Sequence, residues 1–126
     1  MLSQLGQIAM HVTELERAVA FYRDTLQIPF LFQFPGLAFF DCAGVRLMIT
    51  RPESGESPHG NSVLYFKVPD IQAETAALKG RGVKFEGEPH LVAKLPDHDL
   101  WMAFFRDPDE NLLALMSEVK SRESVS

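Results

Sequence analysis

Alternating hydrophobic and polar positions open the chain. In GQIAMHV, residues 6–12, every second residue from Ile8 is apolar, which is typical of a strand with one buried face. Apolar residues at helical spacing follow: Leu15, Ala18, Val19, Tyr22 and Leu26. Thr13 and Glu16 in TELE predict a capping box at the start of this helix, and Pro29 predicts its end. Further strands are predicted at about 30–34, 37–41 and 45–50, with turns at Gly36 and Gly44.

The same order of elements is then repeated. SVLYFKV, 62–68, predicts a strand and the segment from Asp70 to Lys79 a helix, followed by strands near 83–86, 90–95, 100–106 and 111–116. Val12 and Val68 are separated by the same number of residues as Leu15 and Ile71. Such a repeat predicts two equivalent modules in one domain, 1–126. We place module one at about 6–50, a flexible linker at 51–61, module two at about 62–117 and a flexible tail at 118–126.

Composition excludes several classes of function. The chain has 126 residues, of which 46% are hydrophobic and 23% charged, with a net charge of −5. Its basic residues are scattered, whereas nucleic-acid binding needs them clustered. No apolar run approaches the roughly 20 residues of a membrane span, and the first residues show no signal peptide. With Cys42 as its one cysteine, the chain fits a reducing compartment, and we expect it in the cytoplasm.

Three segments carry a family resemblance: QIAMHVTELERAVAFYRDTL, VLYFKVPDI and AFFRDPDENLLALM. They resemble the vicinal oxygen chelate superfamily, which includes glyoxalases, bleomycin-resistance proteins and extradiol dioxygenases. The resemblance implies an α+β fold in which two βαβββ modules curl their mixed sheet into a half-open barrel, with helices on the convex face. Gln27 and Glu110 stand where relatives commonly have Gly, so we expect the local turns to differ.

The resemblance also implies where a metal would bind. Metal-dependent relatives carry His, Gln or Glu at four inward strand positions, because a divalent ion needs several N or O donors. Carried over residue by residue, these positions are Gln7, Met48, Val63 and Ala114. Of these side chains only Gln7 is a suitable ligand type. We therefore expect neither a metal nor another cofactor, although an off-pattern site at His11, His90 or His98 stays an alternative that no spacing favours.

The expected ligand-binding residues are Gln7, His11, Met48, Val63, Tyr65, His98, Trp101 and Ala114. Strand parity turns Gln7 and His11 away from the helix, and Tyr65 offers a flat ring with a hydroxyl. Trp101 and His98 belong to a segment that could close over a ligand. The alternatives are a solvated His11 at a strand end, and core positions for Tyr65 and Trp101. Asp107 and Asp109 are interpreted as caps of their own turn.

Two functions compete. The first is a metal-free homodimer that holds a small hydrophobic or aromatic molecule, in the manner of bleomycin-resistance relatives. Phe30, Phe32, Phe34 and Phe39 could line its cavity or its subunit interface, and Arg46 could contact an anionic ligand or lie exposed. The second is a lyase, epimerase or dioxygenase that uses an off-pattern metal or the groups of His11, Tyr65 or Gln7. A regulatory module without a ligand is a third option.

Overall fold

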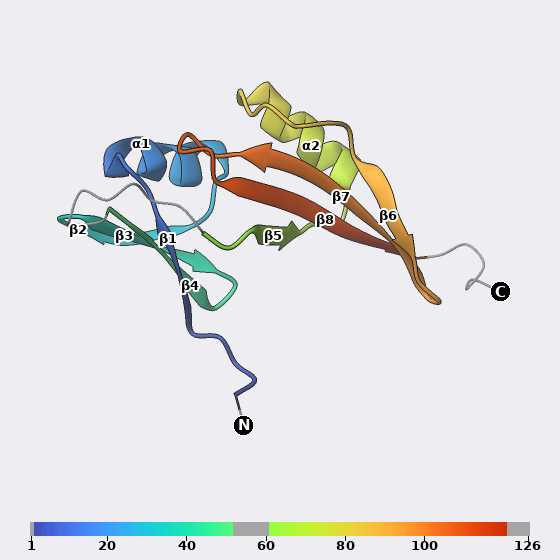
Figure 1. Ribbon diagram of the computed structural model, residues 1–126, viewed down its shortest axis with the longest axis horizontal. Helices are drawn as coiled ribbons and strands as arrows, with labels where there is room; N and C mark the ends of the chain where they lie inside the picture. The colour runs from blue at the N-terminus through green and yellow to red at the C-terminus, as the bar shows by residue number, and fades with distance from the viewer. Residues whose placement is uncertain (1, 52–60, 121–126) are drawn as a thin grey trace. The chain divides into compact units, whose positions relative to one another are not determined.

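The chain forms two compact units, Met1–Ser62 and Val63–Ser126. A computed structural model describes residues 2–51 and 61–120. Each unit contains a four-stranded sheet, ordered β1-β4-β3-β2 in the first and β5-β8-β7-β6 in the second (Figure 1). The pairs β1–β4 and β5–β8 are parallel, and all other neighbours are antiparallel. This is the predicted α+β fold of two βαβββ modules.

The first unit follows the predicted order of elements. Its elements are β1 (Gln7–His11), α1 (Leu15–Ala20), η1 (Phe21–Thr25), β2 (Phe30–Phe34), β3 (Leu37–Cys42) and β4 (Val45–Thr50). Each predicted strand of this module is therefore confirmed to within a residue or two. Asn61 extends the pairing of β1: its side-chain Nδ2 donates to the His11 carbonyl at 3.0 Å, and its Oδ1 accepts from the His11 amide at 3.1 Å.

The second unit differs from the prediction in two places. Its elements are β5 (Leu64–Lys67), α2 (Ile71–Gly80), β6 (His90–Lys94), β7 (His98–Arg106) and β8 (Leu112–Lys120). The strand predicted at 83–86 is wrong, because Phe85 forms only an isolated bridge with Phe105. The predicted tail begins too early, since β8 continues to Lys120. Residues 121–126 of that tail and residues 52–60 of the linker predicted at 51–61 lie outside the described residues.

The first helix begins and ends differently from the prediction. Its N-cap is Glu14, not Thr13, and the Glu14 side chain makes no capping hydrogen bond. After Ala20 the helix widens into the π-type turn η1, where the Leu26 amide donates to the Phe21 carbonyl at 2.9 Å. Gln27 then takes a left-handed backbone, with φ of 59°. That conformation is costly for a residue with a side chain, yet it turns the chain into β2.

The core of the first unit lies between its helical segment and one face of its sheet. Tyr22 is fully buried, its hydroxyl donates to the Met10 sulfur at 3.7 Å, and its ring centroid lies 6.2 Å from that of Phe40. Leu47 and Ile49 of β4 are buried on the same face. The period-two alternation of β1 and β4 therefore selects the face that the helix covers.

The second helix begins with the cap that its sequence predicts. Asp70 is the N-cap, and its carboxylate accepts from the Ala73 amide at 3.1 Å. Ile71, Thr75 and Leu78 are the buried residues of α2, which contacts β7 and β8. The Thr75 hydroxyl is buried and has no hydrogen-bond partner in the described part of the chain, which leaves a polar group desolvated beneath the helix.

The acidic turn between β7 and β8 is structural, as the sequence predicts. Asp107 is buried, and its Oδ1 accepts from the amides of Asp109 and Asn111, each at 2.9 Å. Its Oδ2 accepts from Asn111 Nδ2 at 2.9 Å. Glu110 completes the turn with a φ of 67°, so the backbone there is left-handed even without a Gly.

Among residues 2–51 and 61–120, no helix is long and apolar enough to cross a membrane.

We predict that Thr75→Val stabilises the protein. Val has nearly the shape of Thr but no hydroxyl, so the substitution removes the unpartnered buried group and should add about 1 kcal/mol to the free energy of unfolding. Thermal unfolding followed by circular dichroism would then show a melting temperature higher by several degrees. Thr75→Ser is the matched control, because it keeps the hydroxyl and loses a methyl group. A melting temperature that falls in Thr75→Val would contradict this account of the hydroxyl.

Candidate functional site

Each sheet has a helix on one face, and its opposite face, here called the open face, carries most of the predicted site. In the first unit α1 contacts β3 and β4, and in the second unit α2 contacts β7 and β8. The open face of the first sheet includes Gln7, Ala9, His11 and Met48. That of the second includes Tyr65, Lys67, Phe104, Ala114 and Glu118. Because alternate residues of a strand point to opposite faces, these assignments follow from the pairing registers.

The open face of the first sheet brings Gln7 and Met48 together. The Gln7 Nε2 donates to the Met48 sulfur at 3.9 Å, a weak contact because a thioether is a poor acceptor. Met48 pairs with Ala9 on one side and with Phe39 on the other. His11 lies further along β1, paired with Thr50. Three of the predicted ligand-binding residues thus share one face of one sheet.

Aromatic rings extend this face toward the outer strand β2. The ring of Phe39 lies 4.8 Å from that of Phe32 and 6.5 Å from that of Phe34, measured between centroids. Phe32 and Phe34 are exposed. Phe30 instead packs against the buried Phe40, at 5.5 Å, on the helix-covered face. The four phenylalanines therefore divide between the two faces, and three of them form the open-face cluster.

The open face of the second sheet is built around Ala114. Ala114 pairs with Tyr65 of β5 and with Phe104 of β7, and the two rings lie 6.1 Å apart at 80° to each other. Ala114 is fully buried, whereas Tyr65 keeps 47% of its surface exposed. The His90 ring lies 6.4 Å from that of Phe104, so aromatic side chains continue as far as β6. The small side chain at 114 allows the two larger rings to meet across the strand.

The two sheets place Met48 and Ala114 at equivalent positions. In the first sheet the register aligns Ala9, Met48 and Phe39 across β1, β4 and β3. In the second sheet it aligns Tyr65, Ala114 and Phe104 across β5, β8 and β7. The sequence alone locates Met48 only loosely among the inward positions. The shared register fixes the position of Met48 as the equivalent of Ala114. It also makes Gln7 the equivalent of Val63, because each lies two residues before the partner strand's paired residue, Ala9 or Tyr65.

These four positions do not fit a divalent metal. The first sheet contributes one amide and one thioether, and the second contributes only the hydrocarbon of Val63 and Ala114. Hard divalent ions prefer carboxylate, imidazole or several oxygen donors, and a thioether suits only soft metals. Within residues 2–51 and 61–120, no three His, Cys, Asp or Glu side chains are grouped as metal ligands.

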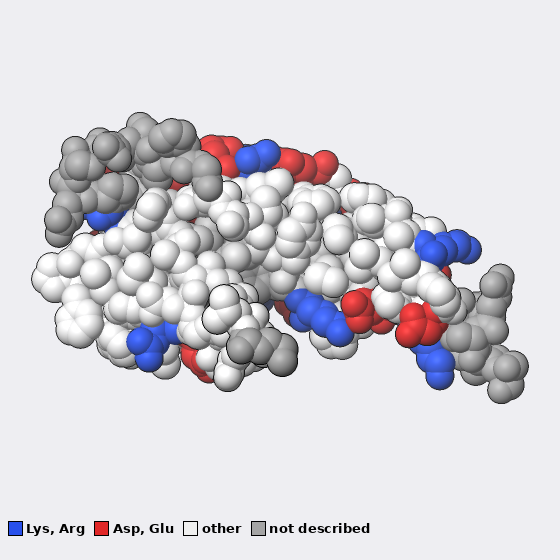
Figure 2. All heavy atoms as spheres, turned by 60° about the horizontal axis from the view of Figure 1, so that its bottom comes forward, with Lys and Arg blue, Asp and Glu red and all other residues white. Residues whose placement is uncertain are grey.

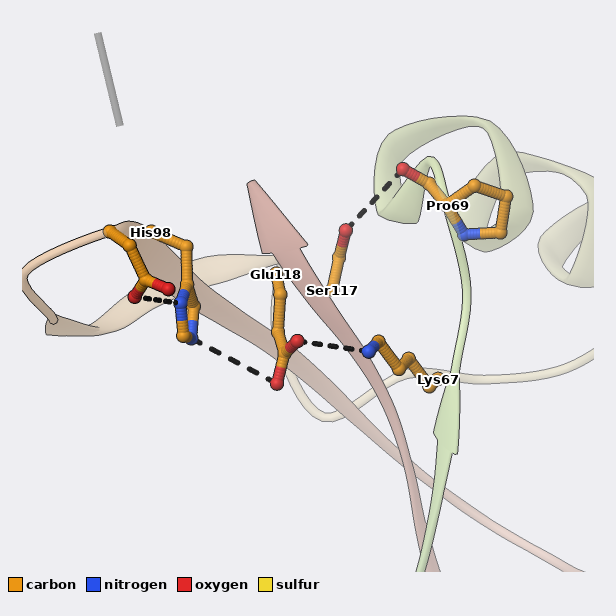
Figure 3. A network of polar contacts seen from close by, with 6 residues as sticks. Lys67, Pro69, His98, Ser117 and Glu118 are labelled. Atoms are coloured by element: carbon orange, nitrogen blue, oxygen red, sulfur yellow. Dashed lines mark hydrogen bonds and ion pairs between the residues drawn. The ribbon is translucent and has the colours of Figure 1, made fainter. Parts of the chain in front are cut away.

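A charged network lies at the end of the second open face. Lys67 Nζ is 2.9 Å from Glu118 Oε1, Glu118 Oε2 is 3.9 Å from His98 Nε2, and His98 Nδ1 is 2.8 Å from Asp97 Oδ1. Figure 3 shows Glu118 pointing toward Lys67 and His98, while the neighbouring Ser117 points to the other side of β8 and donates to the Pro69 carbonyl. His98 Nδ1 is thus hydrogen-bonded to Asp97, while Glu118 lies near Nε2 but beyond hydrogen-bond distance.

Two pKa values reflect this network. The hydrogen bond with His98 holds the pKa of Asp97 below its ordinary value of 3.8. The hydrogen bond with Lys67 likewise holds the pKa of Glu118 below its ordinary value of 4.5. Elsewhere, burial raises the pKa of the Cys42 thiol, which makes that thiol less reactive at neutral pH.

Trp101 does not join the open face. It pairs with Ser117 and shares the parity of the buried residues Ala103 and Phe105, so it lies on the face that α2 covers. This parity favours the alternative of a core position for Trp101, and its role as a ligand-binding residue stays a prediction. His98 does lie on the open face, and Val63 lies half-buried just before β5.

Sequence reasoning missed Phe104, although Phe104 forms the second half of the contact over Ala114. Residues 100–105 of β7 are all apolar, so alternation cannot separate the two faces of this strand. The pairing of Phe104 with Ala114 in β8 resolves the ambiguity. The sequence could have indicated this pairing only by counting residues outward from the DPDEN turn along both strands, which places Phe104 opposite Ala114.

We predict that Ala114→Glu destabilises the fold and gains no metal. A carboxylate at this fully buried position must be desolvated beneath two rings, so we expect a loss of about 3 kcal/mol or more in the free energy of unfolding. Chemical denaturation measures it, and Val119→Glu, at an exposed position of the same strand, is the control with little effect. An Ala114→Glu variant as stable as the wild type would contradict the burial of this site.

We predict that Glu118 contributes to the loss of folding stability at acidic pH. Its pKa is lower in the folded protein than its ordinary 4.5, so its ion pair stabilises the fold above that value and is lost as pH falls through the lower, folded-state pKa. Glu118→Gln should therefore be less stable than the wild type near neutral pH, with the difference shrinking as pH falls below about 4.5. Denaturation midpoints across this range measure the difference. A constant difference down to about pH 3 would refute the linkage.

Comparisons with known proteins agree with this geometry. Residues 4–115 match the family model of the Glyoxalase/Bleomycin resistance protein/Dioxygenase superfamily. The chain is 32% identical to the uncharacterized protein YraH of Bacillus subtilis (strain 168), over 129 aligned positions that cover 89% of this chain and 96% of YraH.

Solved structures show the same fold. A lactoylglutathione lyase from Agrobacterium tumefaciens superposes with a TM-score of 0.73 at 19% identity, covering 91% of this chain and 93% of the other. A glyoxalase/bleomycin resistance protein/dioxygenase from Alicyclobacillus acidocaldarius superposes with a TM-score of 0.74 at 17% identity, with both chains fully covered. The family model, which matches most of the chain, shows that this chain belongs to the glyoxalase/bleomycin resistance protein/dioxygenase superfamily.

Proposed function

We propose that this protein binds a small apolar or aromatic molecule without a metal, in a cleft completed by a second copy of the chain. The observation that carries the proposal is the replacement of metal donors by a thioether at Met48 and by hydrocarbon at Val63 and Ala114. Around two of these positions the open faces present aromatic rings. A surface of this composition gains most of its binding free energy from apolar contact.

Exposed rings give the proposed ligand its contacts. Tyr65 keeps 47% and Phe32 41% of their surfaces exposed, and covering one such ring with a ligand is worth about 1–2 kcal/mol. Gln7 and His11 supply polar groups beside this apolar surface, and His98 supplies one on the second sheet. Trp101 is not included, because it lies on the face that α2 covers.

Apolar residues at the sheet edges favour a homodimer. The outer strand β2 exposes Leu31 and Phe34, and the outer strand β6 exposes Leu91 and Val92. Exposed apolar edge strands are rare in proteins that stay monomeric, because they pair readily with other chains.

The net charge of −5 disfavours a nucleic-acid partner, and the single Cys42 suits the reducing cytoplasm in which we expect the protein to act.

A second candidate is metal-free acid–base catalysis by a lyase or epimerase. It is favoured by the contact of 2.8 Å between His98 Nδ1 and Asp97 Oδ1, because a carboxylate commonly orients a catalytic imidazole. However, the other ring nitrogen of His98 faces Glu118 at 3.9 Å. A base of this kind would have to exchange that neighbour for a substrate, so binding alone is the function that the arrangement supports better.

Metal and ligand titrations distinguish the two kinds of function. We expect that Zn²⁺, Ni²⁺ and Mn²⁺ are not retained in stoichiometric amounts after gel filtration, as measured by elemental analysis. We also expect that the neutral aromatic amide 2-naphthamide raises the melting temperature, because it binds the native state. Tyr65→Leu should weaken that binding by about tenfold, whereas Phe21→Leu, on the helical segment, should not.

Two results would overturn this proposal. One is stoichiometric retention of a metal that is lost in Gln7→Ala, because a metal centre would then exist at the family position. The other is the failure of 2-naphthamide and related neutral aromatic compounds to bind at all. Light scattering coupled to gel filtration tests the homodimer separately, and a strictly monomeric protein at micromolar concentration would contradict it.

A further inference from the structure

We propose that the open face of the first sheet recognises a carboxylate, so that the ligand is an aromatic or apolar acid held by Arg46 and Gln7. This inference rests on the proposed function, because it adds a charged group to the apolar ligand of that site. It concerns the first sheet alone, where Arg46 of β4 pairs with Gln7 of β1 on one side and Asp41 of β3 on the other.

Among the described residues, Arg46 contacts an aromatic ring and no carboxylate. Its guanidinium carbon lies 5.6 Å from the centroid of the Phe39 ring, a cation–π contact. Such stacking uses the face of the guanidinium and leaves its N–H groups free at the edges, where a carboxylate can accept two of them. In the described part of the chain, no hydrogen bond or ion pair to the Arg46 side chain is found, and the residue is exposed.

Other arginines of the chain are paired with acidic groups. Arg17 contacts Glu14 at 3.1 Å, Arg23 contacts Asp24 at 2.9 Å, and Arg106 contacts Glu86 at 2.6 Å. These pairs are what an exposed arginine ordinarily forms on an acidic protein. Arg23 also has a ring contact, 5.9 Å from the centroid of Phe30. Arg46 differs from these three because it has no acidic partner among the described residues and lies on a largely apolar face.

The nearest acidic residue in the ladder is engaged elsewhere. Asp41 is the cross-strand partner of Arg46, but its Oδ1 accepts from the Gly44 amide at 2.9 Å. That hydrogen bond ties the Asp41 carboxylate into the turn between β3 and β4. Among the described residues, no ion pair within 4.0 Å joins Asp41 to Arg46, so the guanidinium remains available to an external carboxylate.

Gln7 provides a second donor beside Arg46. Its Nε2 makes only the weak contact with the Met48 sulfur at 3.9 Å within the described part of the chain. A carboxylate oxygen is a far stronger acceptor than a thioether. An acid bound at Arg46 could therefore also recruit Gln7, while its apolar body lies over Met48 and the rings of Phe32 and Phe39.

Local charge outweighs the net charge in this choice of ligand. The net charge of −5 would favour a cation, but exposed charges are screened over about 8 Å at physiological salt. Figure 2 shows charged side chains in small groups separated by broad areas without Lys, Arg, Asp or Glu. A single well-positioned arginine can therefore determine the charge of the ligand at its own face.

A matched pair of probes tests the proposal. 2-Naphthoate and 2-naphthamide share their ring system and differ in charge, and isothermal titration calorimetry measures the affinity of each. We expect the wild type to bind naphthoate at least about tenfold more tightly, the typical gain from a charge-assisted contact. Arg46→Gln should abolish this preference and leave naphthamide binding within about twofold. Arg46→Lys, which keeps the charge without the planar fork, should retain part of the preference.

Arg51→Gln is the control variant. It removes the same charge from an exposed residue directly after β4, and should keep the full preference for naphthoate. Equal affinities of the wild type for the two probes would overturn the inference and leave the proposed function standing. So would a naphthoate preference that survives in Arg46→Gln or is lost equally in Arg51→Gln. If neither probe binds, the proposed function fails and this inference fails with it.

Discussion

The contact of Tyr65 with Phe104 across Ala114 is the feature on which the character of the site depends. Two aromatic side chains on neighbouring strands can meet over the strand between them only if that strand carries a very small residue at the shared register position. A side chain large enough to bind a metal would have to displace both rings and bring a charge into a dry environment. The small residue at 114 thus excludes a metal ligand and builds an aromatic surface at once.

In the first sheet the large and small side chains occupy the opposite strands of the equivalent pair. Where the second sheet has Tyr65 beside Ala114, the first has Ala9 beside Met48, and a phenylalanine occupies the third strand in both. Met48 is flexible and polarizable, so it fits against rings of varied shape. Both open faces are therefore apolar at their centres, and their polar groups, Gln7 and Arg46 in one and Lys67 and Glu118 in the other, flank them. That arrangement suits a ligand with an apolar body and one polar end.

Much of the fold follows from the sequence, and much of the site does not. The alternation in β1 predicts which of its residues face the helix, Asp70 predicts where α2 begins, and the internal repeat predicts two modules. The sequence left the face of Trp101 open and missed Phe104 for one physical reason. Strand β7 is apolar on both faces, so its orientation depends on pairing with β8, which is a long-range property. That no charged partner of Arg46 is found in residues 2–51 and 61–120 likewise depends on where the Asp41 side chain turns, which local sequence does not specify.

Methyl NMR would test the central claim, an apolar open face that binds aromatic ligands without metal, most directly. Met48, Met102 and Met116 lie on the open faces, whereas Met10 is buried beneath Tyr22 on the helix-covered face. In protein with labelled methionine methyl groups, saturating 2-naphthamide should shift the open-face resonances and leave that of Met10 nearly unchanged. Stoichiometric Mn²⁺ should broaden none of them. Broadening of Met48 by stoichiometric Mn²⁺, with no response to the aromatic ligand, would contradict the account.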